Sequence, residues 1–415
     1  MSAATVVPSS AGATYAQRVA FVSEIAGRLH SYGTTAQRLE AAVIGLSQKL
    51  GLDCEPWSNP TGIILSFSDP TKSIGSSDIT RVIRLAPGEN DLYKLSVADS
   101  VANGRMSIAQ GHTALRRLDR ETDRRGKALQ VLAFGLAAAG VAGLWKLPWL
   151  DIATAGMIGM SIGLLTQYTD KRPATKEAGE ALAGLLAGVV AALVASLVGP
   201  LNLNTVIIAS LVVLLPGMSL TNAFNELASQ HWVSGTARLA GAVTTVLKLT
   251  VGAVIAVTLT QLVGLNPQAA AVRPQAGWVE WASLLVAAYA FAVLFKANRR
   301  DYLWIMAAAM SGYVIARYAG HAWGGPAGVF ASAMALTAAG NLFGRVVQKP
   351  GALIRLPGII MLVPGSTSLR GFLTLVQQQD VTVGQAALLA VTNIVMALVA
   401  GLLFGNLLIP ARKNL

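Results

Sequence analysis

Long apolar runs dominate the chain after residue 127. A helix needs about 20 residues to cross a hydrocarbon core of ~30 Å, and ten runs are long enough. They cover residues 128–147, 150–168, 179–199, 203–223, 235–263, 279–296, 302–319, 323–343, 353–376 and 383–409. The pattern predicts an α-helical polytopic membrane protein with about ten transmembrane helices.

The first third of the chain alternates between shorter helical and strand patterns. Helices are predicted over Tyr15–Ser31, Thr34–Leu50, Asp91–Asn103 and Ser107–Arg125, and strands over Thr61–Ser68 and Ile79–Leu85. We therefore expect a small α+β domain over residues 15–126. The Ser/Ala-rich residues 1–14 are expected to be a disordered lead-in without a cleavable signal sequence.

Composition and charge placement agree with a membrane protein. Hydrophobic residues make up 53% and charged residues 13% of the chain, against about 25% charge in soluble proteins. The net charge of +12 sits in short loops between spans, which favours the positive-inside rule over nucleic-acid binding. With the N-terminal domain inside, the inside loops and ends carry Lys171, Arg172, Lys176, Lys296, Arg299, Arg300, Arg345, Lys349, Arg355, Arg412 and Lys413, and the outside loops carry Lys146 and Arg273. Ten spans then put both termini in the cytoplasm and the 264–278 linker outside.

Two apolar runs contain the same Pro-Gly interruption, at Pro216-Gly217 and at Pro364-Gly365. Proline removes a backbone donor, so each pair predicts a broken helix whose freed polar groups face protein or a watery cavity. Paired broken helices mark the binding site of many secondary transporters, although two simple kinks are the alternative. The candidate substrate-binding residues are Pro216, Gly217, Ser219, Asn222, Pro364, Gly365, Ser366, Ser368 and Arg370.

The interruptions belong to a longer internal duplication. Asp151–Tyr168 aligns with Asp301–Tyr318, and the two interruptions align at nearly the same offset. Residues 127–263 and 279–415 would each hold five spans. An odd number of spans inverts the second copy relative to the first, so the sequence predicts a 5+5 inverted repeat.

Three charged residues are candidates for coupling or gating. Lys248 lies thirteen residues after Gly235, a rise of roughly 20 Å that predicts a position near the bilayer centre. A lysine there needs a carboxylate substrate, a proton-coupling role or a structural partner. Glu226 and Arg238 flank a short inside loop, where either a structural ion pair or a gate is expected.

Motifs of known enzymes and metal sites are missing from the sequence. There is no Gly-x-Ser-x-Gly, His-Glu-x-x-His or phosphate-binding loop, and the single Cys54 excludes an intrachain disulfide. We expect no metal, no cofactor and no catalysis. His30, Glu40 and Cys54 could form a nucleophilic site, but a gating or assembly role for the N-terminal domain is favoured. Glycines four residues apart, such as Gly184/Gly188 and Gly401/Gly405, predict close helix packing.

Three stretches resemble the threonine/serine exporter family. They are Ala26–Gly33 with Arg38-Leu39-Glu40, Leu215–Asn222 continuing to Gly235–Leu239, and Leu362–Ser366 with Arg370-Gly371 and Gly401–Gly405. The resemblance implies a cytoplasmic N-terminal domain, a duplicated ten-span unit, and proton-driven export of L-threonine or L-serine across a bacterial cytoplasmic (inner) membrane.

The resemblance also marks positions. The family pattern falls on Pro216, Gly217, Asn222, Arg238, Pro364, Gly365 and Ser366. Glu226 departs from it, because the family has aspartate there. Some relatives resemble exporters of dicarboxylates such as succinate, so that substrate stays an alternative. A membrane-anchored hydrolase and a channel are alternatives of other classes, and the oligomeric state is open, a homo-oligomer included.

Overall fold

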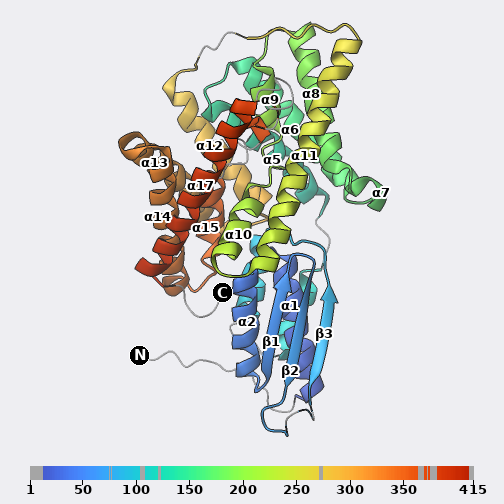
Figure 1. The fold of residues 1–415 in the computed structure, drawn as a ribbon, viewed down its shortest axis with the longest axis vertical. Helices are drawn as coiled ribbons and strands as arrows, with labels where there is room; N and C mark the ends of the chain where they lie inside the picture. Colours follow the sequence, from blue (N-terminus) through green and yellow to red (C-terminus); the bar gives the residue numbers. More distant parts are fainter. Residues whose placement is uncertain are drawn as a thin grey trace.

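The molecule has a helical membrane unit stacked on a smaller α/β domain (Figure 1). The structure is a computed structural model. It describes residues 13–73, 75, 77–102, 108–119, 123–270, 274–362, 369–371, 373 and 381–410.

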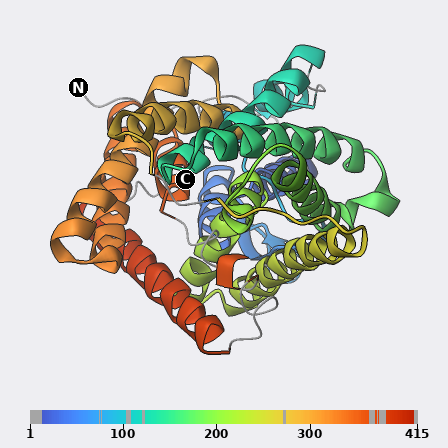
Figure 2. The same cartoon turned by 90° about the horizontal axis from the view of Figure 1, so that it is seen from above.

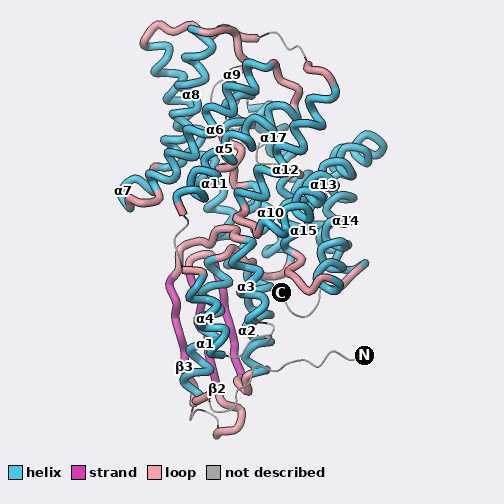
Figure 3. The backbone as a smooth tube through the Cα atoms, turned by 180° about the vertical axis from the view of Figure 1, so that it is seen from behind, coloured by secondary structure: helices cyan, strands magenta, loops and turns pink. Residues whose placement is uncertain are grey.

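The N-terminal domain packs helices against a three-stranded antiparallel sheet of order β1-β2-β3, seen in magenta in Figure 3. Its elements are α1 (Tyr15–Ser31), α2 (Ala36–Lys49), β1 (Asp53–Asn59), β2 (Gly62–Ser68), β3 (Ile79–Arg84), α3 (Leu92–Ala102) and α4 (Ile108–Arg117). Burial alternates along β2, which places Ile63, Leu65 and Phe67 in the core beneath the helices. Strand β1 escaped prediction because it lacks an alternating pattern and contains Pro56, which an edge strand tolerates.

The membrane unit is almost entirely helical. Its elements are α5 (Arg124–Leu144), α6 (Trp149–Thr169), α7 (Pro173–Lys176), α8 (Gly179–Leu197), α9 (Leu203–Ser210), α10 (Gly217–Ala228), α11 (Trp232–Leu262), α12 (Gly277–Leu294), η1 (Arg299–Asp301), α13 (Tyr302–Trp323), α14 (Gly325–Val346), α15 (Ala352–Ile360) and α17 (Val381–Leu408). Among the described residues, seven helices are long and apolar enough to cross a membrane: α5, α6, α8, α11, α12, α14 and α17. The chain is therefore a multi-pass membrane protein.

The other three predicted spans differ from continuous apolar helices. The span predicted at 203–223 divides into α9 and α10. The span predicted at 302–319 corresponds to α13, which is 22 residues long but is not one of the seven. Of the span predicted at 353–376, the described part holds α15. The count of ten thus stays a prediction.

Helix contacts within the first half recur within the second. In the first half, α5 packs on α6, α6 on α8 and α9, and α8 on α9 and α11. In the second half, α12 packs on α13, α13 on α14 and α15, and α14 on α15 and α17. Helices α5 and α12 join the halves.

Small residues allow two of these contacts. A Cβ at Gly184 would lie 2.3 Å from the carbonyl oxygen of Leu249, and one at Gly401 would lie 2.6 Å from that of Phe330. Larger side chains would therefore separate α8 from α11 and α14 from α17. The predicted packing role of these glycines is confirmed.

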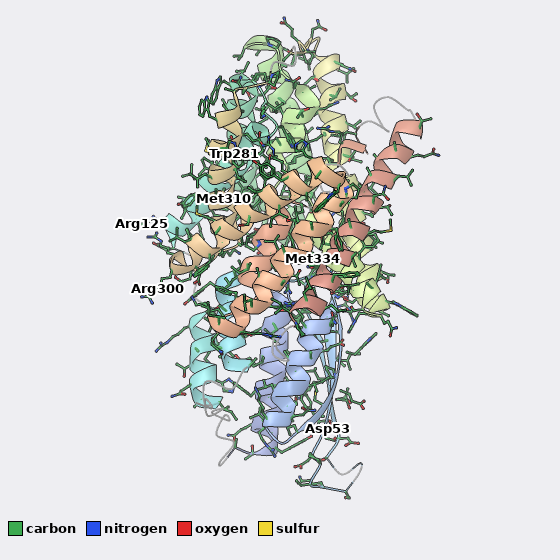
Figure 4. The ribbon with its side chains drawn as sticks, turned by 90° about the vertical axis from the view of Figure 1, so that its left-hand side faces the viewer. Asp53, Arg125, Trp281, Arg300, Met310 and Met334 are labelled. Atoms are coloured by element: carbon green, nitrogen blue, oxygen red, sulfur yellow. The ribbon has the colours of Figure 1, made fainter. Side chains whose placement is uncertain are left out.

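The two ends of the membrane unit differ. At the end away from the N-terminal domain (Figure 1), Leu201 N–H donates to the Gln268 carbonyl and Gln275 N–H to the Lys146 carbonyl, both at 3.0 Å. At the other end, Leu92 N–H donates to the Phe295 carbonyl at 2.9 Å. Seen from above, the blue N-terminal domain lies beneath the middle of the helices (Figure 2). The side chains of Arg125 and Arg300 project from one side of the molecule (Figure 4).

Candidate functional site

The first helix interruption has the predicted form. Helix α9 ends at Ser210 and α10 begins at Gly217, with Pro216 as its N-terminal cap residue. The Gly217 N–H donates to the Leu215 carbonyl at 2.8 Å, so the chain makes a tight turn where the helix is interrupted. Of the second interruption, α15 ends at Ile360, and Pro364, Gly365, Ser366 and Ser368 lie outside the described residues.

One cavity adjoins the first interruption in the middle of the membrane unit. We call it the central cavity, and its volume is about 150 Å³. It is lined by Val141, Leu144, Trp145, Val212, Leu215, Gly217, Met218, Phe291, Tyr313, Ile360 and Met361. Both halves contribute, and no charged side chain is among these described residues. The central cavity is thus an apolar space between the two halves.

A second cavity lies between the membrane unit and the N-terminal domain. We call it the inter-domain cavity, and its volume is about 120 Å³. It is lined by Gly33, Thr34, Thr35, Gln37, Arg38 and Leu95 of the N-terminal domain, and by Met218, Thr221, Asn222, Asn225, Ser229, Pro350, Ala352, Arg355, Leu356, Ile359, Leu402, Leu403 and Asn406 of the membrane unit. Two arginines, amides and hydroxyls make it polar. Among the described residues, Met218 is the lining residue that the two cavities share, so both border on its side chain.

The predicted substrate-binding residues divide between these spaces. Gly217 lines the central cavity and Asn222 the inter-domain cavity, whereas Ser219 lines neither. The guanidinium of Arg370 lies 5.9 Å from the centre of the Trp145 ring, close to the central cavity. The structure thus brings two of the predicted residues, Gly217 and Asn222, into the lining of a cavity, and places Arg370 beside Trp145, which lines the central cavity.

Segments after the two interruptions exchange partners. Met218, just after the first interruption, joins a buried cluster that contains second-half residues such as Leu336 and Leu402. Leu369 and Leu373, from beyond the second interruption, join the first-half cluster around Ile158. Each half therefore completes the core of the other.

Glu226 and Arg238 form a buried ion pair that also holds the N-terminal domain. Arg238 donates from Nε to Oε2 at 3.1 Å and from Nη2 to Oε1 at 3.0 Å. The carboxylate also accepts from Ser234 Oγ at 2.8 Å and from the backbone N–H of Ala36 at 3.0 Å. Glu226 is fully buried. Its negative charge therefore sits at the N-terminus of α2, where the helix dipole favours an anion.

A neighbouring contact strengthens this attachment. His231 Nε2 lies 3.0 Å from Glu40 Oε2 of α2, and the other oxygen of Glu40 accepts from the Ser58 N–H at 2.8 Å. Glu40 is therefore not grouped with His30 and Cys54. Burial raises the pKa of the Cys54 thiol to about 11, the opposite of an activated nucleophile. The nucleophilic grouping gains no support from this geometry.

Lys248 has a structural partner. Its Nζ donates to the Glu177 carbonyl at 2.8 Å and lies 3.6 Å from Glu180 Oε2. Helix α8 begins at Gly179, so Lys248 lies level with the start of that span. These contacts place Lys248 near the end of a span and not at the expected position near the bilayer centre. The reason is that α11 is 31 residues long, longer than a bilayer requires.

Sequence reasoning missed a buried charge cluster beside the central cavity. Glu280 pairs with Lys146 at 3.0 Å and with Arg317, and it accepts from the hydroxyl of Tyr313 at 2.7 Å. Tyr313 in turn lines the central cavity. The signal was an acidic residue one position inside a predicted span. Among the described residues, no group of acidic, His or Cys side chains could hold a metal ion.

The amino-acid sequence is similar to two family models and to several fungal membrane proteins. Residues 20–260 match a family model described as a putative threonine/serine exporter, and residues 280–408 match a second model described as a threonine/serine exporter. Three yeast proteins called pheromone-regulated membrane protein 10 are similar: those of Zygosaccharomyces rouxii (24% identity over 363 residues), Candida glabrata (23% over 391) and Eremothecium gossypii (23% over 390). No solved structure matches the chain.

The alignments cover most of this chain but only part of each relative. The alignments cover 85% of this chain and 37% of the Zygosaccharomyces protein, and 91% of this chain with 49% and 52% of the other two. The chain thus spans about half or less of the length of these relatives. Their printed names state membrane location and regulation by pheromone, and no substrate.

Proposed function

Because the chain belongs to the threonine/serine exporter family, we propose that it is a secondary exporter of small hydroxy amino acids, L-threonine and L-serine. The single observation that carries this proposal is the interrupted helix at Pro216-Gly217, because the next residue, Met218, lines two cavities. A broken helix that joins two hollows is the arrangement expected for a solute path through a membrane bundle.

The path would run through two inverted five-helix repeats. Equivalent contacts support this architecture: Asp151 accepts from the Asn202 amide at 2.6 Å beside α9, and Asp301 pairs with Lys349 beside α15. The first contact lies next to Leu201, in the loops away from the N-terminal domain. The second lies next to Pro350, which lines the inter-domain cavity. Equivalent groups at opposite ends are what inversion of the second repeat requires.

Transport would proceed by alternating access, with the two halves rocking about the contact between α5 and α12. Segments beyond each interruption are packed into the opposite half. When one half moves, it would therefore also move the cavity-lining segment that comes from the other half. In this proposal Met218 is a gate between the cavities, and the buried pair Glu226–Arg238 is the residue pair that couples the gate to the N-terminal domain.

The location proposed for this chain is the bacterial cytoplasmic (inner) membrane. Basic residues in the loops beside the N-terminal domain, such as Lys296 and Arg300, support a cytoplasmic position for that domain. The proton gradient is the proposed driving force, as in the family resemblance. No catalytic step is assigned to the N-terminal domain.

Export of a small dicarboxylate is a second candidate. The observation that favours it is the charge of the inter-domain cavity, where Arg38 and Arg355 occur without any acidic residue among the described lining. A zwitterion would leave one of these two charges unneutralised, whereas a dicarboxylate would neutralise both.

Counterflow in proteoliposomes tests the proposal and separates the candidates. Vesicles with the full chain are loaded with unlabelled solute, and uptake of labelled threonine, serine or succinate is measured with and without a pH gradient. We expect saturable exchange of threonine or serine that responds to the gradient. Exchange of succinate alone would favour the second candidate, and unsaturable flux without a gradient effect would indicate a channel.

A further inference from the structure

The inter-domain cavity is built by both domains, and some of its polar groups have no partner among the described residues. Arg38 projects from the first turns of α2, and none of the described residues forms a hydrogen bond or ion pair with its side chain. Burial lowers the pKa of Arg38 to about 10, which still leaves the guanidinium charged at neutral pH. Arg38 is partly buried, and a charge shielded from water without a partner is costly, so a native protein rarely keeps one unless something binds it.

Unpaired hydroxyls line the same space. The side-chain oxygens of Thr35 and Thr221 are buried and have no hydrogen-bond partner among the described residues, and both residues line the cavity. Thr221 is only 2% exposed. Buried hydroxyls are nearly always hydrogen-bonded in native proteins, so two unsatisfied ones in one cavity indicate a polar ligand.

The buried carboxylate at the start of α2, Glu226, is already occupied by other donors. Glu226 lies at the start of α2, but its two oxygens already accept from Ala36, Ser234 and twice from Arg238. No acidic residue is among the described lining of the cavity, which also contains Arg355. The local charge is therefore positive, and the ligand that fits is a small anion with oxygen acceptors.

We propose that the inter-domain cavity is the entry site of the exporter for a small carboxylate, and that Arg38 of the N-terminal domain binds its carboxylate group. This rests on the proposed function and extends it, because the N-terminal domain then contributes a substrate-binding residue. Thr221 and the amide of Asn222 are placed to bind the rest of the solute. From there Met218 is the next side chain on the path to the central cavity.

Kinetics of the full chain in proteoliposomes test the assignment. The half-saturating concentration and the maximal rate are measured for the wild type, Arg38→Gln, Arg38→Lys and Arg81→Gln. Losing a charge-assisted hydrogen bond should raise the half-saturating concentration about tenfold or more in Arg38→Gln. The maximal rate should change much less, and Arg38→Lys should recover part of the affinity. Arg81→Gln is the matched control, because it removes the same charge from exposed strand β3 of the same domain.

A second variant separates binding from folding. Thr221→Val removes an unsatisfied buried hydroxyl at nearly constant volume, so the protein should be as stable as the wild type or more stable. If Thr221 binds substrate, affinity nevertheless falls. An unchanged half-saturating concentration in both Arg38→Gln and Thr221→Val would overturn the assignment.

Binding to the detergent-solubilised full chain makes the test independent of transport. Thermal shifts are measured with threonine, succinate and inorganic phosphate for the wild type and Arg38→Gln. We expect stabilisation by a carboxylate that Arg38→Gln loses, even if the wild type moves none of these solutes in vesicles. Such a result would reject the proposed function and retain the site. Equal stabilisation by phosphate, or stabilisation that Arg38→Gln keeps, would reject a carboxylate site at Arg38.

Discussion

The central and inter-domain cavities differ in chemistry although Met218 lines both of them. The central cavity is lined by aliphatic and aromatic side chains from both halves. The inter-domain cavity offers two arginines, amides and unpaired hydroxyls, several of them from the N-terminal domain. Selection among polar solutes needs placed polar groups, whereas a passage works best without strong binding. In the proposed mechanism, recognition would therefore occur beside the N-terminal domain and passage between the halves.

The largest effect is expected from closing the connection between the cavities. Pro216→Leu combined with Gly217→Ala should restore a regular helix where the chain now turns, because both new residues accept helical geometry. We expect efflux to be abolished while membrane insertion and expression remain. Radiolabelled efflux and membrane-fraction yield are the measurements. Normal efflux from this double variant would remove the interruption from the transport path.

The second-largest effect is expected from separating the N-terminal domain from the membrane unit, which would open the inter-domain cavity and leave the central cavity intact. Glu226→Gln breaks the ion pair between the fully buried Glu226 and the partly buried Arg238, and it weakens the bond to the N-terminus of α2. Loss of one partner of a buried pair costs about 3–5 kcal/mol, so the N-terminal domain should separate from the membrane unit. Limited proteolysis of the full chain in detergent would show faster cleavage between the two. The exposed Glu89→Gln serves as the control, and equal protection of all three proteins would show that Glu226 does not hold the domain.

Acid should act on the inter-domain side alone. The pKa of His30 is lowered, chiefly by burial and further by the charge of Arg238, so the unfolded chain gains a proton near pH 6.5 that the folded domain does not. The free energy of unfolding therefore falls as the pH drops below about 6.5, by at most ~1.4 kcal/mol per pH unit. Denaturant unfolding of the full chain between pH 7.5 and 5 measures this slope. His30→Gln should flatten it, and an unchanged slope would assign the pH dependence to other groups.

The smallest effect concerns the second attachment of the N-terminal domain. Lys296 pairs with Glu89 at 3.2 Å, but the two side chains are 39% and 74% exposed. Exposed pairs contribute about 0–1 kcal/mol, so Lys296→Gln should leave domain attachment and efflux almost unchanged. Proteolysis and efflux assays on this variant, side by side with Glu226→Gln, measure the contrast. If Lys296→Gln weakened domain attachment as much as Glu226→Gln does, the exposed Lys296–Glu89 pair would contribute more than its exposure predicts.

Sequence reasoning found the membrane class and the first interruption because proline and glycine act locally. The α1 and β2 patterns also follow from local periodicity. It gave Arg38 and Thr221 no binding role and missed Glu280, because their surroundings depend on which segments meet in space. It placed Lys248 by counting residues along one helix, but the partner Glu180 comes from another helix. The repeat offset was visible in the sequence, whereas the exchange of Met218 and Leu369 between halves was not.

The most direct test of two cavities in series is a blocking group at their junction. Cys54 is the single native cysteine, so Met218→Cys in a Cys54→Ser background carries one thiol, at the side chain shared by both cavities. The protein is treated with a thiol reagent in proteoliposomes, and labelling and threonine or serine efflux are measured on the same sample. We predict that labelling stops efflux and that saturating substrate slows the labelling. Complete labelling with undiminished efflux would contradict the account.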